Sequence, residues 1–293
     1  MKDLYDVSGI SKQSFHQWLD RRYCRIDEQL QLLPILSQLR EDHPGMSSRM
    51  FYVKLKPKTM GRDLFEQFCF EHGFKVNIKR RGYRTTNSKG VHWFPNLLLE
   101  KDELGDTNQV WVSDITYYDL PGKVVYITFI QDLYNREITG YSLSQYLNTE
   151  YTTIPALKLA IKNKKLGQKS GLIFHSDGGG QYYSKAFVTL TKAYGIRNSM
   201  GKTAYENPHA ERINGTIKNQ YLYLWRPKSY KELGELLAKA VYLYNNERPH
   251  QSLERHTPSA FKTLKDKGLL TKTWVINKKK KVTKKEKVNI NII

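Results

Sequence analysis

The sequence has few cysteines and no long apolar segment. Its 293 residues contain two cysteines, Cys24 and Cys69. Neither lies in a CxxC or CxxH cluster, so the sequence predicts neither a disulfide framework nor a zinc site. No run approaches the ~20 apolar residues needed to cross a bilayer. The first ten residues also lack the basic start and apolar core of a signal peptide. We therefore expect a soluble, cytoplasmic protein with no membrane partner.

Acidic residues are scarce relative to basic ones. Lys and Arg number 48 against 28 Asp and Glu, which gives a formal net charge of +20. An excess of this size favours a polyanionic partner such as DNA or RNA. The composition is 39% hydrophobic and 12% aromatic, which provides enough apolar material for one large folded domain or two to three smaller ones.

Helical patterns and basic segments dominate the first 90 residues. Segment 1–25 contains a turn at Gly9 and a predicted helix over 12–20 that Ser11 would cap, typical of a helix-turn-helix or of a plain helical hairpin. Region 26–90 is predicted to hold helices near 26–41 and 61–72, followed by a basic stretch that either binds DNA or forms a solvated linker. The residues here that we expect to contact DNA are Arg62, Lys79, Arg80, Arg81 and Arg84.

The pattern changes between residues 105 and 262. β-Branched and aromatic runs predict strands over 110–119, 123–132 and 136–144. Helices and short strands then alternate: a helix at 150–165, a strand ending near 177, a helix at 184–194, a strand at 196–200, and helices at 207–224 and 230–246. This order indicates an RNase H-like α/β fold, with a mixed five-stranded sheet and flanking helices, preceded by small all-α modules of helix-turn-helix type. Residues 263–293 are expected to be a disordered basic tail, because seven of the ten residues from 278 to 287 are lysine.

Three carboxylates are the candidate catalytic residues. Asp114 lies in an apolar run, where an unpaired charge is expensive, Asp177 ends a strand and precedes three glycines, and Glu211 lies near the start of a helix. Two strands and a helix can bring three acids to one point, and such oxygen ligands suit Mg²⁺ or Mn²⁺ better than zinc. Two such ions can activate an attacking oxygen and stabilise a leaving oxygen at a phosphodiester. Glu206 is an alternative third acid, and Asp132 an alternative second.

Five segments, in order, resemble the DDE transposases of insertion sequences, specifically the OrfB-type proteins of insertion-sequence family three, whose core is similar to retroviral integrase. The segments are WVSDITYY, FIQDLYNREITGYSLS, FHSDGGGQYYSKAF, SMGKTAYENPHAERINGTIK and YNNERPHQSLERHTPSAF. The resemblance implies that Asp114, Asp177 and Glu211 are the metal-binding acids. Between the last two lie 33 residues, two fewer than the family usually has.

The resemblance also implies roles for residues around these acids. Asn207 matches the residue before the catalytic helix, and Lys218 matches a basic residue of that helix that would contact DNA. Arg212 would lie near a bound phosphate. The closing motif is interpreted as mainly structural, and its residues are Tyr244, Asn245, Arg248, Pro249 and His250.

The implied function is transposition. The enzyme would release a 3′-hydroxyl at each element end and join it to another phosphodiester, using two Mg²⁺ ions, for which Mn²⁺ can substitute. Its partners would be double-stranded DNA (terminal repeats and target), further copies of itself on that DNA, and a DNA-binding protein from an upstream reading frame. The enzyme would act in the bacterial cytoplasm, at the nucleoid. The alternatives are a catalytically impaired or repurposed DNA-binding protein, and an RNase H-like nuclease that hydrolyses without joining.

Overall fold

The computed structural model describes residues 9–76, 94–201 and 206–276. The chain divides into two compact units, Met1–Lys79 and Arg80–Ile293, called here the N-terminal and C-terminal units. No helix in the described ranges is both long and apolar enough to cross a membrane.

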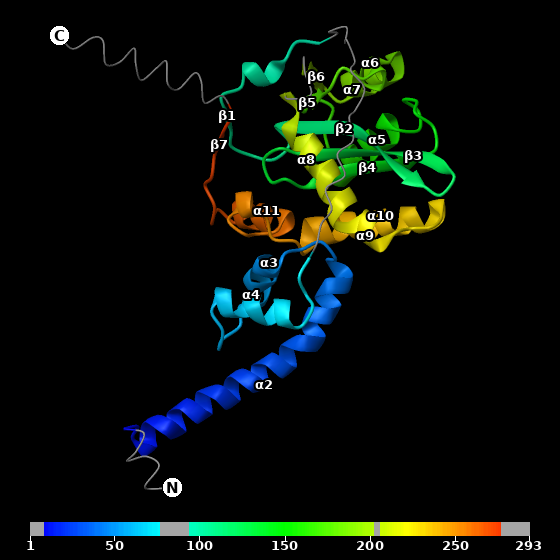
Figure 1. Ribbon diagram of the computed structural model, residues 1–293. Helices are drawn as coiled ribbons and strands as arrows, with labels where there is room; N and C mark the ends of the chain where they lie inside the picture. The colour runs from blue at the N-terminus through cyan, green and yellow to red at the C-terminus, as the bar shows by residue number, and fades with distance from the viewer. Residues whose placement is uncertain (1–8, 77–93, 202–205, 277–293) are drawn as a thin grey trace, which may run out of the picture. The chain divides into compact units, whose positions relative to one another are not determined.

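The described part of the N-terminal unit is helical, as the sequence predicts. Its helices are α2 (Lys12–Asp42), α3 (Ser48–Leu55) and α4 (Arg62–Glu71) (Figure 1). Leu36, Phe51 and Phe65 are fully buried in a shared core. The guanidinium of Arg40 donates to the carbonyls of Met46, at 2.7 Å, and Phe74, at 2.6 Å, and so fastens the chain after α4 to the end of α2.

The predicted separation of helices at 12–20 and 26–41 is wrong. Ser11 does cap the first turn, since its hydroxyl accepts a hydrogen bond from the Ser14 backbone N–H at 3.1 Å. The helix then continues to Asp42 without a break, because the segment between the two expected helices contains no glycine or proline to end it. The first helix of a helix-turn-helix would fall on residues 1–8, which lie outside the described residues.

The C-terminal unit contains the predicted mixed five-stranded sheet. Its strands are β2 (Val110–Leu120), β3 (Lys123–Asp132), β4 (Ile138–Ser144), β5 (Ile173–Ser176) and β6 (Arg197–Met200), in the order β4-β3-β2-β5-β6. The β2/β3 and β3/β4 pairs are antiparallel, whereas β5 is parallel to both β2 and β6. The RNase H-like strand arrangement is therefore confirmed.

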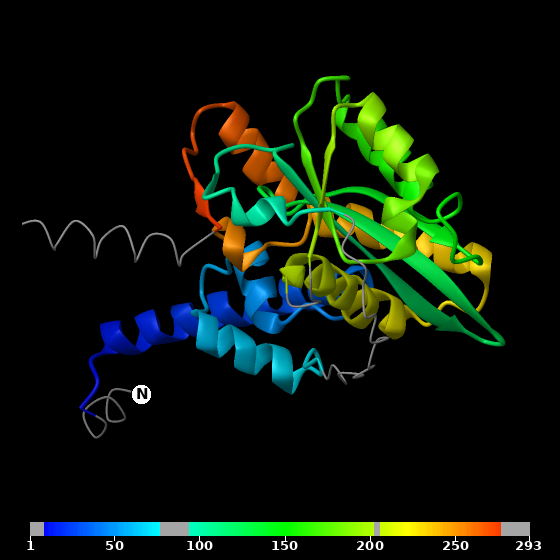
Figure 2. The same cartoon turned by 90° about the horizontal axis from the view of Figure 1, so that it is seen from above.

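Helices cover both faces of this sheet (Figures 1 and 2). One face packs against α5 (Thr153–Lys164), α6 (Gly180–Tyr183) and α7 (Lys185–Ala193) around Trp111 and Phe174. The other packs against α8 (Pro208–Ile217), a π-helical turn η3 (Lys218–Leu222), α9 (Tyr223–Trp225) and α10 (Tyr230–Asn246). Gly140 of β4 allows the close approach of α5, because a Cβ there would lie 2.2 Å from the Ala156 carbonyl oxygen.

The folded core extends past the boundary predicted at residue 262. Helix α11 (Pro258–Asp266) is followed by β7 (Trp274–Val275), which pairs antiparallel with β1 (Glu103–Leu104). The Trp274 indole stacks on Phe261 and donates to the Tyr134 carbonyl at 2.9 Å. Residues 263–276 thus belong to the C-terminal unit, although their high lysine content suggests otherwise. The lysine-rich stretch after them lies outside the described residues.

Candidate active site

Asp114 lies in the middle of the central strand β2 and faces helix α8. Its Oδ2 accepts a hydrogen bond from Asn214 Nδ2 at 2.8 Å. Burial, together with the negative charges of Asp177 and Glu211, raises the pKa of Asp114 to about 7. The structure therefore brings the three predicted acids close enough for two of them to act electrostatically on the third.

Asp177 follows strand β5, which is the parallel neighbour of β2. Its Oδ1 accepts the backbone N–H of Gly179 at 3.2 Å. An added Cβ on Gly179 would lie 3.1 Å from that same oxygen, so the glycine leaves the carboxylate room. Burial raises the pKa of Asp177 as well, because a desolvated carboxylate is unfavourable without a counter-charge.

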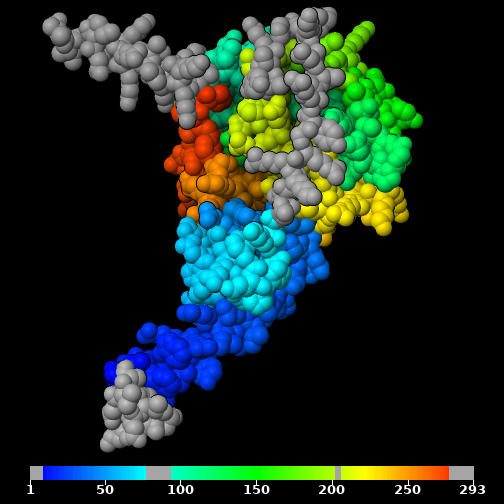
Figure 3. Space-filling view, in the orientation of Figure 1, coloured from blue at the N-terminus to red at the C-terminus, as the bar shows by residue number. Residues whose placement is uncertain are grey.

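Glu211 lies in the first turn of α8, and its side chain is exposed. Asn207 precedes this helix and Pro208 is its first residue, a favoured start because proline has no N–H to leave unbonded. The helix reaches the surface of the C-terminal unit (Figure 3). A carboxylate that is solvent-accessible beside two less accessible ones is suited to meeting an incoming substrate.

One side of α8 is fastened along β2. Asn207 Nδ2 donates to the Ser113 carbonyl at 2.9 Å, and Lys218 Nζ donates to Thr116 Oγ1 at 2.7 Å. Together with the Asn214 contact to Asp114, these contacts hold the helix at three residues of the strand. The sequence singled out Asn207 and Lys218 but missed Asn214, which its spacing of three residues from Glu211 could have indicated.

The two alternative acids have other partners. Glu206 Oε2 accepts from Asn96 Nδ2 at 2.6 Å. Asp132 is fully buried, and its carboxylate accepts the backbone N–H groups of Asn108, at 2.6 Å, and Tyr134, at 2.8 Å. Burial raises the pKa of Asp132 to about 6. These contacts indicate that Asp132 organises the chain at the end of the sheet and that Glu206 holds the segment before α8.

The donor set fits a hard divalent cation. It consists of carboxylates, and next to them the Oδ1 atoms of Asn207 and Asn214 are buried without a hydrogen-bond donor among the described residues. Oxygen ligands of this kind suit Mg²⁺ or Mn²⁺. Within the described ranges, no three His, Cys, Asp or Glu side chains are gathered tightly enough to hold an ion as they stand.

The remaining predicted DNA contacts are dispersed. Arg212 is exposed on α8, and Arg62, which begins α4 in the N-terminal unit, lies 2.7 Å from the Asp63 carboxylate. The others fall outside the described residues, namely Lys79, Arg80, Arg81 and Arg84.

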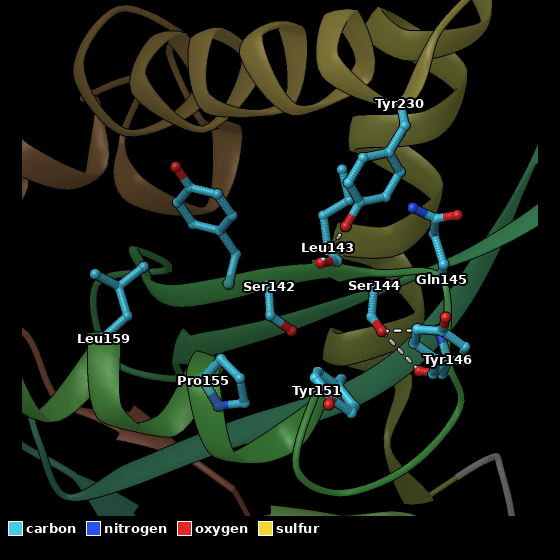
Figure 4. A pocket seen from close by; sticks show the side chains of 10 residues that line it. Ser142, Leu143, Ser144, Gln145, Tyr146, Tyr151, Pro155, Leu159 and Tyr230 are labelled. Atoms are coloured by element: carbon cyan, nitrogen blue, oxygen red, sulfur yellow. Dashed lines mark hydrogen bonds between the residues drawn. The ribbon is translucent and has the colours of Figure 1, made fainter.

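A cavity of about 550 Å³ lies along β4, between α5 and α10, away from the acids. Figure 4 shows the Tyr230 hydroxyl directed at the Leu143 carbonyl, to which it donates at 2.9 Å, and the Ser144 hydroxyl bonded to Tyr146. The residues that line this cavity include neither a carboxylate nor a basic side chain, so it has no charged group to pair with a metal ion or a phosphate.

Comparison with known proteins matches this unit to integrase cores. Two families described as integrase core domain match residues 106–205 and 194–258. The chain is 29% identical over 267 residues to the "Insertion element IS600 uncharacterized 31 kDa protein" of Shigella sonnei, covering 87% of this chain and 96% of that protein. It is 35% identical over 157 residues to the "Transposase for insertion sequence element IS629" of Shigella sonnei, covering 52% and 51%.

Further relatives and solved structures are also similar to this chain. The "Putative transposase InsK for insertion sequence element IS150" of Escherichia coli K12 is 28% identical over 196 residues, covering 64% of this chain and 66% of that protein. Among solved structures, the HTLV-2 integrase catalytic core domain in complex with magnesium (dimeric form) aligns with a TM-score of 0.42 and 23% identity, over 52% of this chain and 94% of that one. The catalytic core domain of BIV integrase aligns with a TM-score of 0.40 and 15% identity, over 55% and 97%.

Proposed function

Since the chain belongs to the DDE transposases of insertion sequences, with an integrase-type core, we propose that it cuts DNA at the ends of its own element and transfers the released 3′-hydroxyl to another phosphodiester. The observation that carries this proposal is the placement of the three acids. Asp114 lies on β2, Asp177 follows the neighbouring parallel strand β5, and Glu211 lies on α8, whose Asn214 is hydrogen-bonded to Asp114. The raised pKa of Asp114, caused by burial and by the charges of Asp177 and Glu211, agrees with this placement.

We assign Asp114, Asp177 and Glu211 to two Mg²⁺ ions, with Mn²⁺ as a substitute. Divalent ions bound there would supply activation of an attacking oxygen and stabilisation of a leaving oxygen at a phosphodiester. The chain's own contribution is positional. Asn214 orients the Asp114 carboxylate, and Asn207 fixes the start of the helix that carries Glu211.

The partners follow from the same function. The substrate is double-stranded DNA, both the terminal repeats of the element and the target, and the net charge of +20 supports sequence-independent attraction to it. We further infer that several copies act together on the DNA, that an upstream-frame DNA-binding protein assists, and that the site of action is the bacterial cytoplasm at the nucleoid. Arg62, Lys79, Arg80, Arg81 and Arg84 are proposed phosphate contacts outside the core.

The test is a strand-transfer assay. Labelled duplexes are taken from the DNA that flanks the gene, so that they contain the element ends, and are incubated with the protein, Mg²⁺ and a target plasmid. Labelled DNA covalently joined to the plasmid, and absent with Asp177→Asn, is the expected result. Cleavage without joining would instead indicate a nuclease. Tight binding of both DNAs without cleavage would indicate an impaired or repurposed protein.

A further inference from the structure

A second cavity of the C-terminal unit, of about 410 Å³, is rich in basic side chains. It is lined by residues from the chain after β3, from α8 and from the closing motif, including Arg136, Arg212, Arg248, His209 and His250. None of its lining residues is Asp or Glu. Three guanidinium groups thus surround one hollow without a carboxylate in its wall, which makes the hollow attractive to an anion.

This cavity lies on the side of α8 opposite the acids. His209, Arg212 and Thr216 recur at intervals of three and four residues and share one face of the helix. Glu211 and Asn214 occupy the other face. A helix with its side chains is about 10–12 Å across, so a group bound in the cavity is distinct from the group that reacts between the acids.

The partners of these arginines within the cavity are neutral. Arg248 donates from Nε and Nη2 to Gln220 Oε1, at 3.2 Å and 3.1 Å. Arg136 Nη1 donates to His209 Nδ1 at 3.1 Å. His250 donates from Nε2 to the Tyr244 carbonyl at 3.3 Å. Burial, reinforced by the charge of Arg248, lowers the pKa of His250 to about 3, so this ring adds no charge near neutral pH.

Burial leaves the positive charge of Arg136 poorly compensated. Burial lowers the pKa of Arg136 to about 10, and the negative charge of Asp132 offsets that decrease only in part. The Asp132 carboxylate is already taken up by the backbone N–H groups of Asn108 and Tyr134. Burying a charge without a close counter-ion is unfavourable. A bound anion would supply the missing counter-charge.

We propose that this cavity binds a phosphate group of the DNA backbone at a position other than the one being cut. The guanidinium group of arginine can hold a phosphate with two parallel hydrogen bonds, and three arginines line the cavity. The inference rests on the proposed function, because it takes DNA as the ligand. It gives Arg248, which the sequence suggested to be mainly structural, a place in substrate binding.

The test is DNA binding by the full chain in EDTA, where cleavage is prevented. Affinity for a labelled duplex is measured over a series of salt concentrations for the wild type, Arg212→Gln and Arg248→Gln. The matched control is Arg197→Gln, an exposed arginine of β6 outside the cavity. Each cavity variant is expected to weaken binding about 10-fold, as for a lost charge-assisted hydrogen bond, and to lower the slope of log K against log salt by about 1. The control variant Arg197→Gln should change the affinity and the salt slope much less.

Equal changes in all three variants would overturn the proposal. Circular dichroism checks each fold, and because Arg212 is exposed, its variant remains informative if Arg248→Gln fails to fold. A second arm measures the melting temperature with inorganic phosphate. A phosphate-induced rise that is lost in Arg248→Gln, with unchanged DNA affinity, would assign the cavity to free phosphate and overturn the DNA assignment. Failure of strand transfer leaves these binding results intact, so the two proposals are tested separately.

Discussion

Asn214 donates a hydrogen bond to Asp114 at 2.8 Å across 100 residues of sequence, and so joins helix α8 to the central strand β2. Because the bond favours the ionised carboxylate, its loss should raise the pKa of Asp114 further. We predict that Asn214→Ala lowers the rate of metal-dependent DNA nicking about 10-fold and moves the acid limb of the pH–rate profile upward. A slower reaction with an unchanged pH–rate profile would show that Asn214 affects only the stability of the fold.

Asp114 should destabilise the metal-free protein at alkaline pH. Its pKa in the fold is raised to about 7 from the usual 3.8, so the stability contributed by its protonated form is present below pH 3.8 and is lost as the pH rises through about 7. We predict that Asp114→Asn, which mimics that form, raises the melting temperature in EDTA at pH 8 by several degrees, at about 2–4 °C per kcal/mol.

The matched control for this prediction is Asp119→Asn, an exposed residue of the same strand, which should leave the melting temperature unchanged. Mg²⁺ should reduce the difference in melting temperature between Asp114→Asn and the wild type. The ion compensates the repulsion among the three carboxylates, and only the wild type has all three. A lower melting temperature for Asp114→Asn in EDTA would contradict the assembly of mutually repelling acids.

Buried histidines should make the fold sensitive to acid. Burial lowers the pKa of His175 to about 4 and that of His250 to about 3. Because the folded-state values lie below 6.5, this stabilisation is present above pH 6.5 and is lost as the pH falls toward the folded values. We predict that the difference in unfolding free energy between the wild type and His250→Gln, measured with urea, is largest above pH 6.5 and shrinks toward pH 4. A difference that does not change with pH would contradict this prediction.

The segment after residue 262 should be needed for stability. Trp274 stacks on Phe261 and bonds the Tyr134 carbonyl, so Trp274→Ala removes apolar contact and leaves that carbonyl without this donor. We expect a loss of about 2–3 kcal/mol in unfolding free energy, less than for a fully buried tryptophan because Trp274 is half-exposed. Leu269→Ala, at a side chain that is 71% exposed, is the control, and an equal loss for both would contradict the packing described.

The parts of the fold that the sequence revealed are those with local signals. The β-branched runs around Asp114 and the glycines after Asp177 predict strands and their ends from neighbouring residues alone. The parts it missed depend on distant contacts. Trp274 pairs with a strand about 170 residues earlier, and lysines around it suggest disorder. The arginines of the phosphate cavity come from separate segments, so no local pattern brings them together before the chain folds.

The most direct test of the three-acid site is nicking of supercoiled plasmid DNA in Mg²⁺ or Mn²⁺ by the wild type, Glu211→Gln and Glu206→Gln. Glu211 acts on Asp114 electrostatically, whereas Glu206 bonds Asn96. We predict that nicking falls at least about 100-fold in Glu211→Gln, as for loss of an essential group, and persists in Glu206→Gln. Loss of nicking in Glu206→Gln, with full activity in Glu211→Gln, would contradict the site.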